Sequence, residues 1–233
     1  MLFGMDLGDG DRKEHLPWAK AGFVVVAYEV EGVMPEDGQQ TDENIFRQMR
    51  RYTDCWAGMQ NGKAALDYAL ANVPAIDPTK LIAAGHSSAG TTALLFGAHE
   101  PRLRGVAAFM PCTDVVKRLP KDAQEMGEKE IPGFRNFLAR SSPLSHVANY
   151  RAPMFVFGAD DDSNVPIGEI RTFVAALEKA KKPVIFDHVP TGDHYEPMLD
   201  PGIGRAIVWA QALFAGKAAA PAVPKPDAGG KKG

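Results

Sequence analysis

Short runs of apolar residues alternate with longer amphipathic segments along most of this chain. Each run is apolar throughout, as strands are when both faces of their sheet are covered. The predicted strands are residues 23–28 (FVVVAY), 81–84, 106–110, 154–157 and 184–186. Strands that alternate with helices in this way form a mostly parallel sheet with helices packed on its faces. The sequence therefore predicts an α/β fold.

A helical pattern fills the segment between the first two predicted strands. Apolar residues recur there at alternating spacings of four and three from Ile45, and the same stripe resumes as far as Leu70. This spacing predicts one long amphipathic helix, weakened locally by Gly58 and Gly62. Two further helices are predicted over residues 171–181 and 205–214.

Composition limits the classes of protein worth considering. With 233 residues, 45% hydrophobic residues and a net charge of −3, the chain fits one globular domain over residues 1–215. Its Lys and Arg residues are scattered, so neither nucleic acid nor an anionic membrane is expected as a partner. Cys55 and Cys112 are too few for a disulfide framework or a cysteine-rich metal site.

The two ends of the chain carry their own expectations. The opening MLFGMDLGDGDRKEH lacks the basic start and apolar core of a signal peptide, and no apolar run is long enough to span a membrane. A soluble chain is expected, cytoplasmic if this N-terminus is the natural one. Residues 216–233 have few large apolar side chains and are expected to form a disordered tail. Oligomeric state is not predicted.

A cluster of small and polar residues, GHSSAG, lies where the second predicted strand gives way to a helix. In a nucleophile elbow, a serine on a sharp strand-to-helix turn has small residues two positions to either side, because the two backbones nearly touch. Ser87 has Gly85 before it and Ala89 after it, whereas Ser88 has the bulky His86 at the leading position. Ser87 is therefore the predicted nucleophile, although the strict pattern has glycine at position 89.

A serine hydroxyl needs a base to remove its proton and an acid to orient that base. The stretch GADDDSNVP places three acids just after one predicted strand, and TGDHYEP places His194 in a loop after the next. The order serine, acid, histidine is that of the α/β-hydrolases. His188 ends a predicted strand and His86 adjoins the nucleophile, so both are expected to have structural roles.

These three segments resemble the catalytic domain of the prolyl oligopeptidase family and its dienelactone hydrolase-like relatives, over about residues 20–215. The resemblance implies an α/β-hydrolase fold. It also implies an acid three residues after the glycine that closes its strand, which is Asp161 counted from Gly158. Counting back from the NVP end of the loop selects Asp162 instead. Asp161 is favoured, Asp162 is the alternative, and Asp160 is expected to be a solvated loop acid.

An oxyanion hole requires two N–H donors. The first is expected from Ser88, immediately after the nucleophile. The resemblance implies that the second comes from a His-Gly turn after an early strand. Here Phe3 and Gly4 stand in its place, which makes Met5 the expected donor and suggests a fold shortened at its N-terminus.

The predicted function is a serine hydrolase that acts by acyl transfer and needs neither a metal nor an organic cofactor. A small-ester hydrolase is favoured because peptidases of the resembled family usually carry a large propeller domain, and none is evident here. A prolyl oligopeptidase-type peptidase is the alternative, and an inactive hydrolase scaffold or fragment is another. Residues 111–150 are expected to form a short lid, with Phe134 and Phe137 facing the pocket.

Overall fold

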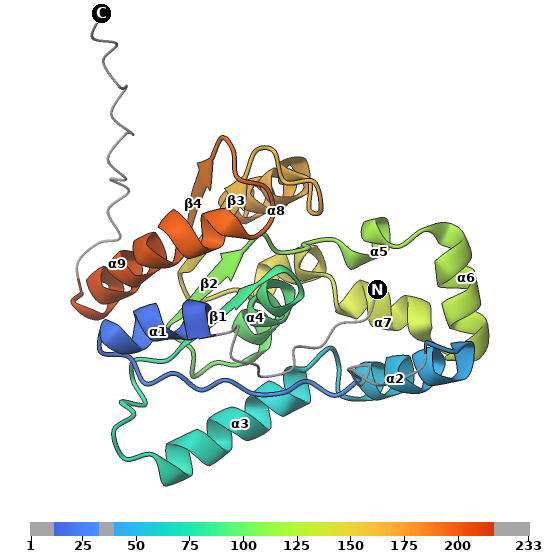
Figure 1. Ribbon diagram of the computed structural model, residues 1–233, viewed down its shortest axis with the longest axis horizontal. Coiled ribbons are helices and arrows are strands. Elements are labelled where there is room, and N and C mark those ends of the chain that lie inside the picture. Colours follow the sequence, from blue (N-terminus) through green and yellow to red (C-terminus); the bar gives the residue numbers. More distant parts are fainter. Residues whose placement is uncertain (1–11, 33–39, 217–233) are drawn as a thin grey trace, which may run out of the picture.

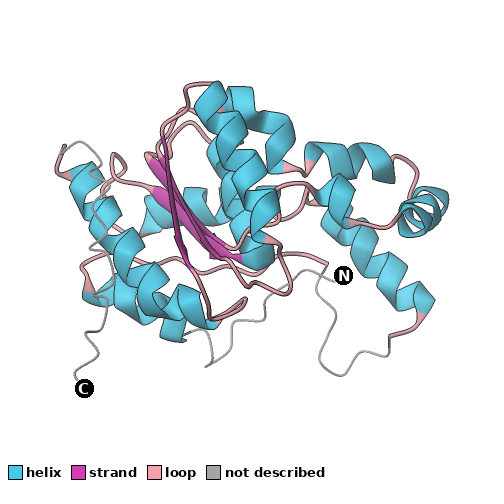
Figure 2. Ribbon diagram, turned by 90° about the horizontal axis from the view of Figure 1, so that it is seen from above, coloured by secondary structure: helices cyan, strands magenta, loops and turns pink. Residues whose placement is uncertain are grey.

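The computed structural model describes residues 12–32 and 40–216, and its centre is a four-stranded parallel sheet in the order β1-β2-β3-β4 (Figure 1). The strands are β1 (Ile82–His86), β2 (Gly105–Phe109), β3 (Met154–Ala159) and β4 (Val184–Val189). Helices cover both faces of the sheet (Figure 2). The predicted α/β-hydrolase type of fold, a mostly parallel sheet flanked by helices, is confirmed.

Three of the described helices precede β1, and the others lie between the strands or after β4. The helices are α1 (Arg12–Lys20), α2 (Asp42–Asp54), α3 (Met59–Asn72), α4 (Ser87–His99), α5 (Val115–Arg118), α6 (Lys121–Glu130), α7 (Phe134–Arg140), α8 (Ile167–Lys179) and α9 (Ile203–Phe214). A 3₁₀ helix covers Pro143–Asn149, and a short helical turn covers Met198–Gly202. The helices predicted over residues 171–181 and 205–214 are α8 and α9. None of the described helices is both long enough and apolar enough to cross a bilayer.

The sheet separates two apolar clusters. On one face, α4 and α8 pack against β2 and β3 through residues that include Leu94, Ile170 and Phe173. On the other face, α1 and α9 pack against the same strands through residues that include Trp18 and Trp209. Every residue of β2 and β3 is buried, so their continuous apolar character reflects burial on both faces.

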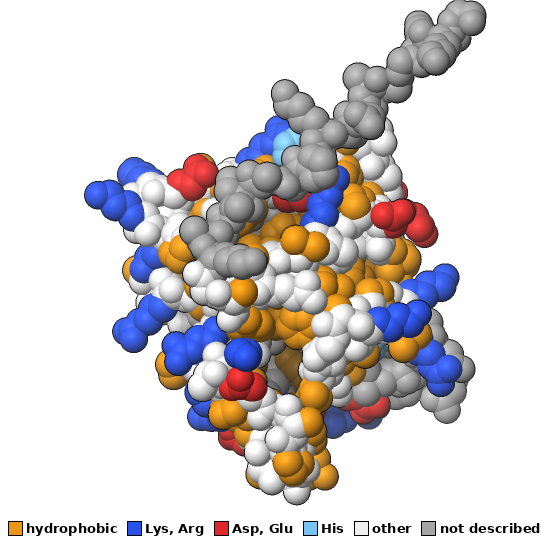
Figure 3. Space-filling model, turned by 90° about the vertical axis from the view of Figure 1, so that its left-hand side faces the viewer, with side chains coloured by type: hydrophobic (Ala, Val, Ile, Leu, Met, Phe, Trp, Pro, Cys, Tyr) orange, Lys and Arg blue, Asp and Glu red, His pale blue; other side chains and the backbone are white. Residues whose placement is uncertain are grey.

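The predicted strand at residues 23–28 is wrong. Residues 23–30 belong to no helix or strand, and Val24, Val25 and Val26 are 48%, 37% and 44% exposed. A cavity of about 660 Å³ lies between this segment and β1, and residues of α1 and α3 also line it. Figure 3 faces this side of the molecule, where hydrophobic side chains surround a hollow. An apolar, β-branched run forms a strand only where a neighbouring strand pairs with its backbone groups. Among the described residues, no strand pairs with residues 23–30.

The single helix predicted from Ile45 to Leu70 is also wrong, because α2 ends at Asp54 and α3 begins at Met59. Between them Trp56 and Ala57 have φ values of 50° and 53°, and Gly58 has a φ of 83°. A Cβ at Gly58 would lie 2.9 Å from Val30 Cγ1, so glycine is needed there for space as well as for conformation. The apolar stripe continues across the break because both helices pack beneath α4 and α7.

Residues 111–150 form α5, α6, α7 and the 3₁₀ helix. Helices α5, α6 and α7 extend beyond the sheet (Figure 1), whereas the 3₁₀ helix packs against α4 and α8. Phe134 and Phe137, predicted to face the pocket, are each 4% exposed and line a cavity described below. The tail predicted at residues 216–233 lies, apart from residue 216, outside the described residues.

Candidate active site

Ser87 occupies the turn between β1 and α4, as the sequence predicts. Its φ is 51°, a left-handed value that is strained for a residue with a side chain. A Cβ at Gly85 would lie 2.3 Å from the Ala89 carbonyl oxygen, and one at Gly90 would lie 2.9 Å from the Gly85 carbonyl oxygen. The turn thus requires glycine at positions 85 and 90, whereas Ala89 is accommodated.

His194 lies beside this serine, although 107 residues separate them in the chain. Its Nε2 is 2.9 Å from Ser87 Oγ. Its Nδ1 is 2.8 Å and 3.0 Å from the two carboxylate oxygens of Asp162. The Asp162 side chain is fully buried and the His194 side chain is 17% exposed. A continuous line of hydrogen bonds therefore joins Ser87, His194 and Asp162.

The expectation that Asp161 contacts the histidine is wrong. Its carboxylate instead accepts hydrogen bonds from the backbone N–H groups of Gly192, at 3.1 Å, and Asp193, at 2.9 Å. The count from Gly158 fails because strand pairing continues beyond that glycine, with Asp160 N donating to Val189 O at 2.9 Å. The turn therefore begins later, and the carboxylate that reaches the imidazole is one residue further on.

Asp160 and His188, which the sequence places outside the site, pair with each other. His188 Nδ1 lies 3.0 Å from Asp160 Oδ1, and Arg171 donates to the same oxygen at 2.8 Å. Both side chains of the His188–Asp160 pair are substantially exposed, at 40% and 36%.

The surroundings of Asp162 favour its ionised form. Burial by itself would raise the pKa of this carboxyl group, but hydrogen bonds from His194 and from two backbone N–H groups lower the pKa below its usual value. Those N–H groups belong to Val165, at 2.7 Å, and Asn164, at 2.8 Å. A buried carboxylate held in this way can orient an imidazole and stabilise its protonated form.

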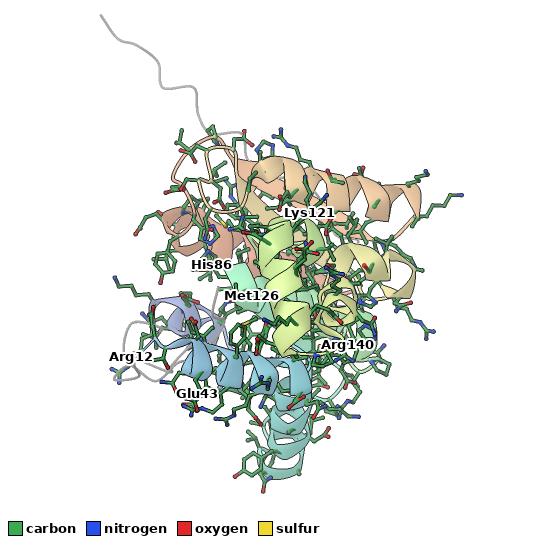
Figure 4. The ribbon with its side chains drawn as sticks, turned by 90° about the vertical axis from the view of Figure 1, so that its right-hand side faces the viewer. Arg12, Glu43, His86, Lys121, Met126 and Arg140 are labelled. Carbon is green, nitrogen blue, oxygen red and sulfur yellow. The ribbon has the colours of Figure 1, made fainter. Side chains whose placement is uncertain are left out.

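An apolar cavity of about 280 Å³ reaches Ser88, the residue after the elbow serine. Residues from α2, α5, α6 and α7 line it, including Phe134, Phe137 and Met126. Figure 4 looks onto α6, which carries the labelled Lys121 and Met126. Cys112 also lines the cavity, and burial raises the pKa of its thiol to about 11, so the thiol is neutral.

Of the two predicted oxyanion donors, Ser88 is among the described residues. Ser88 lies in the first turn of α4, where backbone N–H groups have no partner within the helix. Met5 lies outside the described residues. Within residues 12–32 and 40–216, no group of three or more His, Cys, Asp or Glu side chains is arranged to hold a metal ion.

Sequence reasoning missed one contact of this site. His86 was expected only to pack at the elbow, yet its Nε2 lies 2.7 Å from the carbonyl oxygen of His194. The only sequence feature that pointed to this contact is the position of His86 directly before Ser87. Sequence alone does not show that His86 contacts His194.

A parallel sheet covered by helices, with a strained serine turn at the carboxyl end of one strand, is the α/β-hydrolase architecture. Within that class the chain belongs to the prolyl oligopeptidase family, whose model matches residues 11–209. The resemblance noted in the sequence is thereby confirmed. No curated protein sequence matches the chain significantly.

Solved structures of similar fold include peptidases and an esterase. An acylaminoacyl peptidase of Pyrococcus horikoshii has a TM-score of 0.60 and 14% identity, over 80% of this chain and 31% of that one. A butyrate-bound esterase of Thermogutta terrifontis has a TM-score of 0.55 and 19% identity, over 70% and 66%. A puromycin-hydrolyzing peptidase of Mycobacterium tuberculosis has a TM-score of 0.52 and 19% identity, over 66% and 25%.

Identities this low show a shared fold. The chain spans about a third of the length of the Pyrococcus peptidase and two thirds of that of the Thermogutta esterase. Family membership and these neighbours together support a serine hydrolase as the general class.

Proposed function

We propose that the protein hydrolyses carboxylic esters through an acyl-enzyme, with Ser87 as nucleophile, His194 as base and Asp162 as the orienting acid. Ser87 Oγ attacks the ester carbonyl while His194 Nε2 takes its proton, and the imidazolium then returns the proton to the departing alkoxide oxygen. Water activated by His194 releases the acyl group and restores Ser87. The observation that carries the proposal is the line of hydrogen bonds from Ser87 Oγ to the buried Asp162 carboxylate.

The negative charge on the tetrahedral intermediate needs N–H donors close to the attacked carbon. The proposed first donor is the backbone N–H of Ser88, at the positive end of the α4 dipole. Met5 remains the proposed second donor, on the sequence alone. Neither role requires a metal or an organic cofactor.

The lining of the 280 Å³ cavity favours a neutral, apolar acyl group. Apart from Asp42, the residues that line it are uncharged, and most are apolar or aromatic. A small or medium acyl chain can be buried there against Phe134 and Phe137. In this proposal α6 and α7 form the lid over the acyl chain. This lining supports an ester with an apolar acyl part.

A peptidase is the second candidate, supported by the family match and by neighbours that are named as peptidases. An amide and an ester differ in leaving group, whereas the attack by Ser87 is the same. A p-nitrophenyl ester is intrinsically more reactive than an anilide, so turnover of an N-acylated phenylalanyl anilide, and not the ratio of the two rates, separates the candidates. The proposal predicts hydrolysis of p-nitrophenyl butyrate and no detectable hydrolysis of the anilide.

The test of the nucleophile is a pair of adjacent substitutions. Ser87→Ala should abolish ester hydrolysis and labelling by a fluorophosphonate. Ser88→Ala should retain both at a reduced level, since alanine keeps the backbone N–H. Full activity in Ser87→Ala would overturn the assignment. An unlabelled wild-type protein would favour an inactive hydrolase scaffold.

A further inference from the structure

His86 is the last residue of β1 and directly precedes Ser87. Its ring centroid lies 4.7 Å from that of His194, and its Nε2 lies 2.7 Å from the His194 carbonyl oxygen. A carbonyl oxygen only accepts hydrogen bonds, so Nε2 must carry the proton. Burial lowers the pKa of His86 to about 4, which keeps the ring neutral in ordinary buffers. His86 is thus a fixed donor that points at the backbone of His194.

The loop that carries His194 has an unusual backbone. Gly192 and Asp193 have φ values of 124° and 60°. Asp161 holds the loop from the side of β3, by accepting the N–H groups of both residues. His86 holds the next residue from the side of β1, by donating to its carbonyl. The loop is therefore anchored both to the residues after β3, which leads to Asp162, and to the end of β1, which leads to Ser87.

Tyr195 also packs against the ring of His86. The two rings meet edge to face, with centroids 5.5 Å apart. The Tyr195 hydroxyl donates to Glu14 of α1 at 3.1 Å. The ring of His86 thus contacts both His194 and Tyr195, which restricts its rotation and keeps Nε2 directed at the carbonyl.

We propose that His86 is a positioning residue for His194: its Nε2–H holds the His194 peptide so that the imidazole stays within hydrogen-bonding distance of Ser87 Oγ. The inference rests on the proposed function of Ser87 and His194. His86 touches neither the Ser87 hydroxyl nor a reacting atom in the mechanism above, and its effect is on the geometry of the base. Displacements on the order of 1 Å at a reacting group can cost about 100-fold in rate.

Two substitutions separate the donor from the ring. His86→Phe keeps a ring of similar size but removes the donor, whereas His86→Gln keeps an N–H near the position of Nε2 without the ring. We expect kcat for p-nitrophenyl butyrate to fall about 10- to 100-fold in His86→Phe with KM changed less than about twofold. His86→Gln should recover most of kcat. The rate constant for fluorophosphonate labelling should follow kcat in both.

His188→Phe is the matched control, because His188 pairs with Asp160 away from Ser87 and is 40% exposed. Its kcat should equal that of the wild type. Circular dichroism and thermal unfolding confirm that each variant is folded, and His86→Leu replaces His86→Phe if the latter is insoluble.

The role of His86 is overturned if His86→Phe keeps the wild-type kcat. It is also overturned if kcat falls as much in His86→Gln as in His86→Phe. Ser87→Ala and His194→Ala, measured in the same assay, separate this result from failure of the proposed function. If both are inactive while His86→Phe is fully active, the role of His86 alone is refuted. If either retains activity, the proposed mechanism itself fails, and the positioning role fails with it.

Discussion

Asp162 meets His194 while its neighbour Asp161 holds the backbone of the same loop. Asp162→Asn should lower kcat by about 10³- to 10⁴-fold, because an amide can donate to Nδ1 and so favour the wrong tautomer of His194. Asp161→Asn should cost far less, since its amide oxygen can still accept a backbone N–H. Steady-state kinetics on both variants is the measurement. A larger loss in Asp161→Asn would return the orienting role to that residue.

The choice between Asp161 and Asp162 shows how far a residue can be predicted by counting positions from a motif. The three consecutive carboxylates identify the loop, and the order serine, acid, histidine predicts its role. Which of them reaches the imidazole depends on where strand pairing stops, and the hydrogen bond from Asp160 N to Val189 O moves that point beyond Gly158. A backbone hydrogen bond between distant segments leaves no local mark in the sequence.

The depressed pKa of His86 links stability to pH. Its pKa is about 4 in the folded protein against 6.5 ordinarily, so between these values the unfolded chain binds a proton that the folded chain does not. The contribution of this group to stability is therefore full above about pH 6.5 and is lost as the pH falls toward 4. Between pH 7 and pH 5 the loss is about 2 kcal/mol.

His86→Gln removes this titration and keeps a donor. On going from pH 7 to pH 5, the wild type should lose about 2 kcal/mol more of its free energy of unfolding than the variant does. Urea denaturation at the two pH values measures both losses. Equal losses in the two proteins would mean that His86 is protonated in the folded state at pH 5.

The elbow between β1 and α4 depends on the absence of a side chain at Gly85. A Cβ there would lie 2.3 Å from the Ala89 carbonyl oxygen and 2.8 Å from the Gly90 nitrogen, both of them backbone atoms that cannot easily move. Gly85→Ala should therefore destabilise the protein by about 3 kcal/mol or more. Ala89→Gly should cost only about 1 kcal/mol, the usual penalty for glycine in a helix.

Urea denaturation of the two variants, with the wild type as reference, measures the contrast. Similar midpoints for Gly85→Ala and the wild type would show that strand and helix can separate at the elbow without loss of stability.

The requirement for glycine at position 85 was predictable from the sequence pattern. That Gly90, rather than residue 89, supplies the second small position follows from the packing of α4 on β1 and from the nearby Phe109 carbonyl, which lies 3.1 Å from a Cβ placed there.

Helix periodicity was a reliable guide to which faces are buried and a poor one to where helices end. The stripe from Ile45 to Leu70 does face the core, yet the chain turns at Trp56, Ala57 and Gly58. Two of these three residues carry side chains in a left-handed conformation, which nothing in their residue types predicts. Tertiary packing against Val30 and Thr92 selects the break.

At the scale of the molecule, the predicted strands that became β1 to β4 share a property that residues 23–28 lack. Each of the four has at least one parallel neighbour, in the same order along the sheet as along the chain. An apolar, β-branched run shows that a segment can form a strand, but a sheet also requires a partner at the right place. The described residues provide none between the FVVVAY segment and β1.

The outer edge of β1 borders the 660 Å³ hollow, and in the described part of the chain no strand pairs with it. Free backbone groups along an apolar edge are a template for pairing with another molecule. We therefore expect loss of activity on warming to be partly bimolecular, with half-lives that shorten as protein concentration rises. Ala84→Lys, which adds a charge at an exposed position of β1, should reduce that dependence. Half-lives that are the same at all concentrations would instead indicate unimolecular unfolding. If the loss is bimolecular, storage life depends on how dilute the protein is kept as much as on how tightly its core is packed.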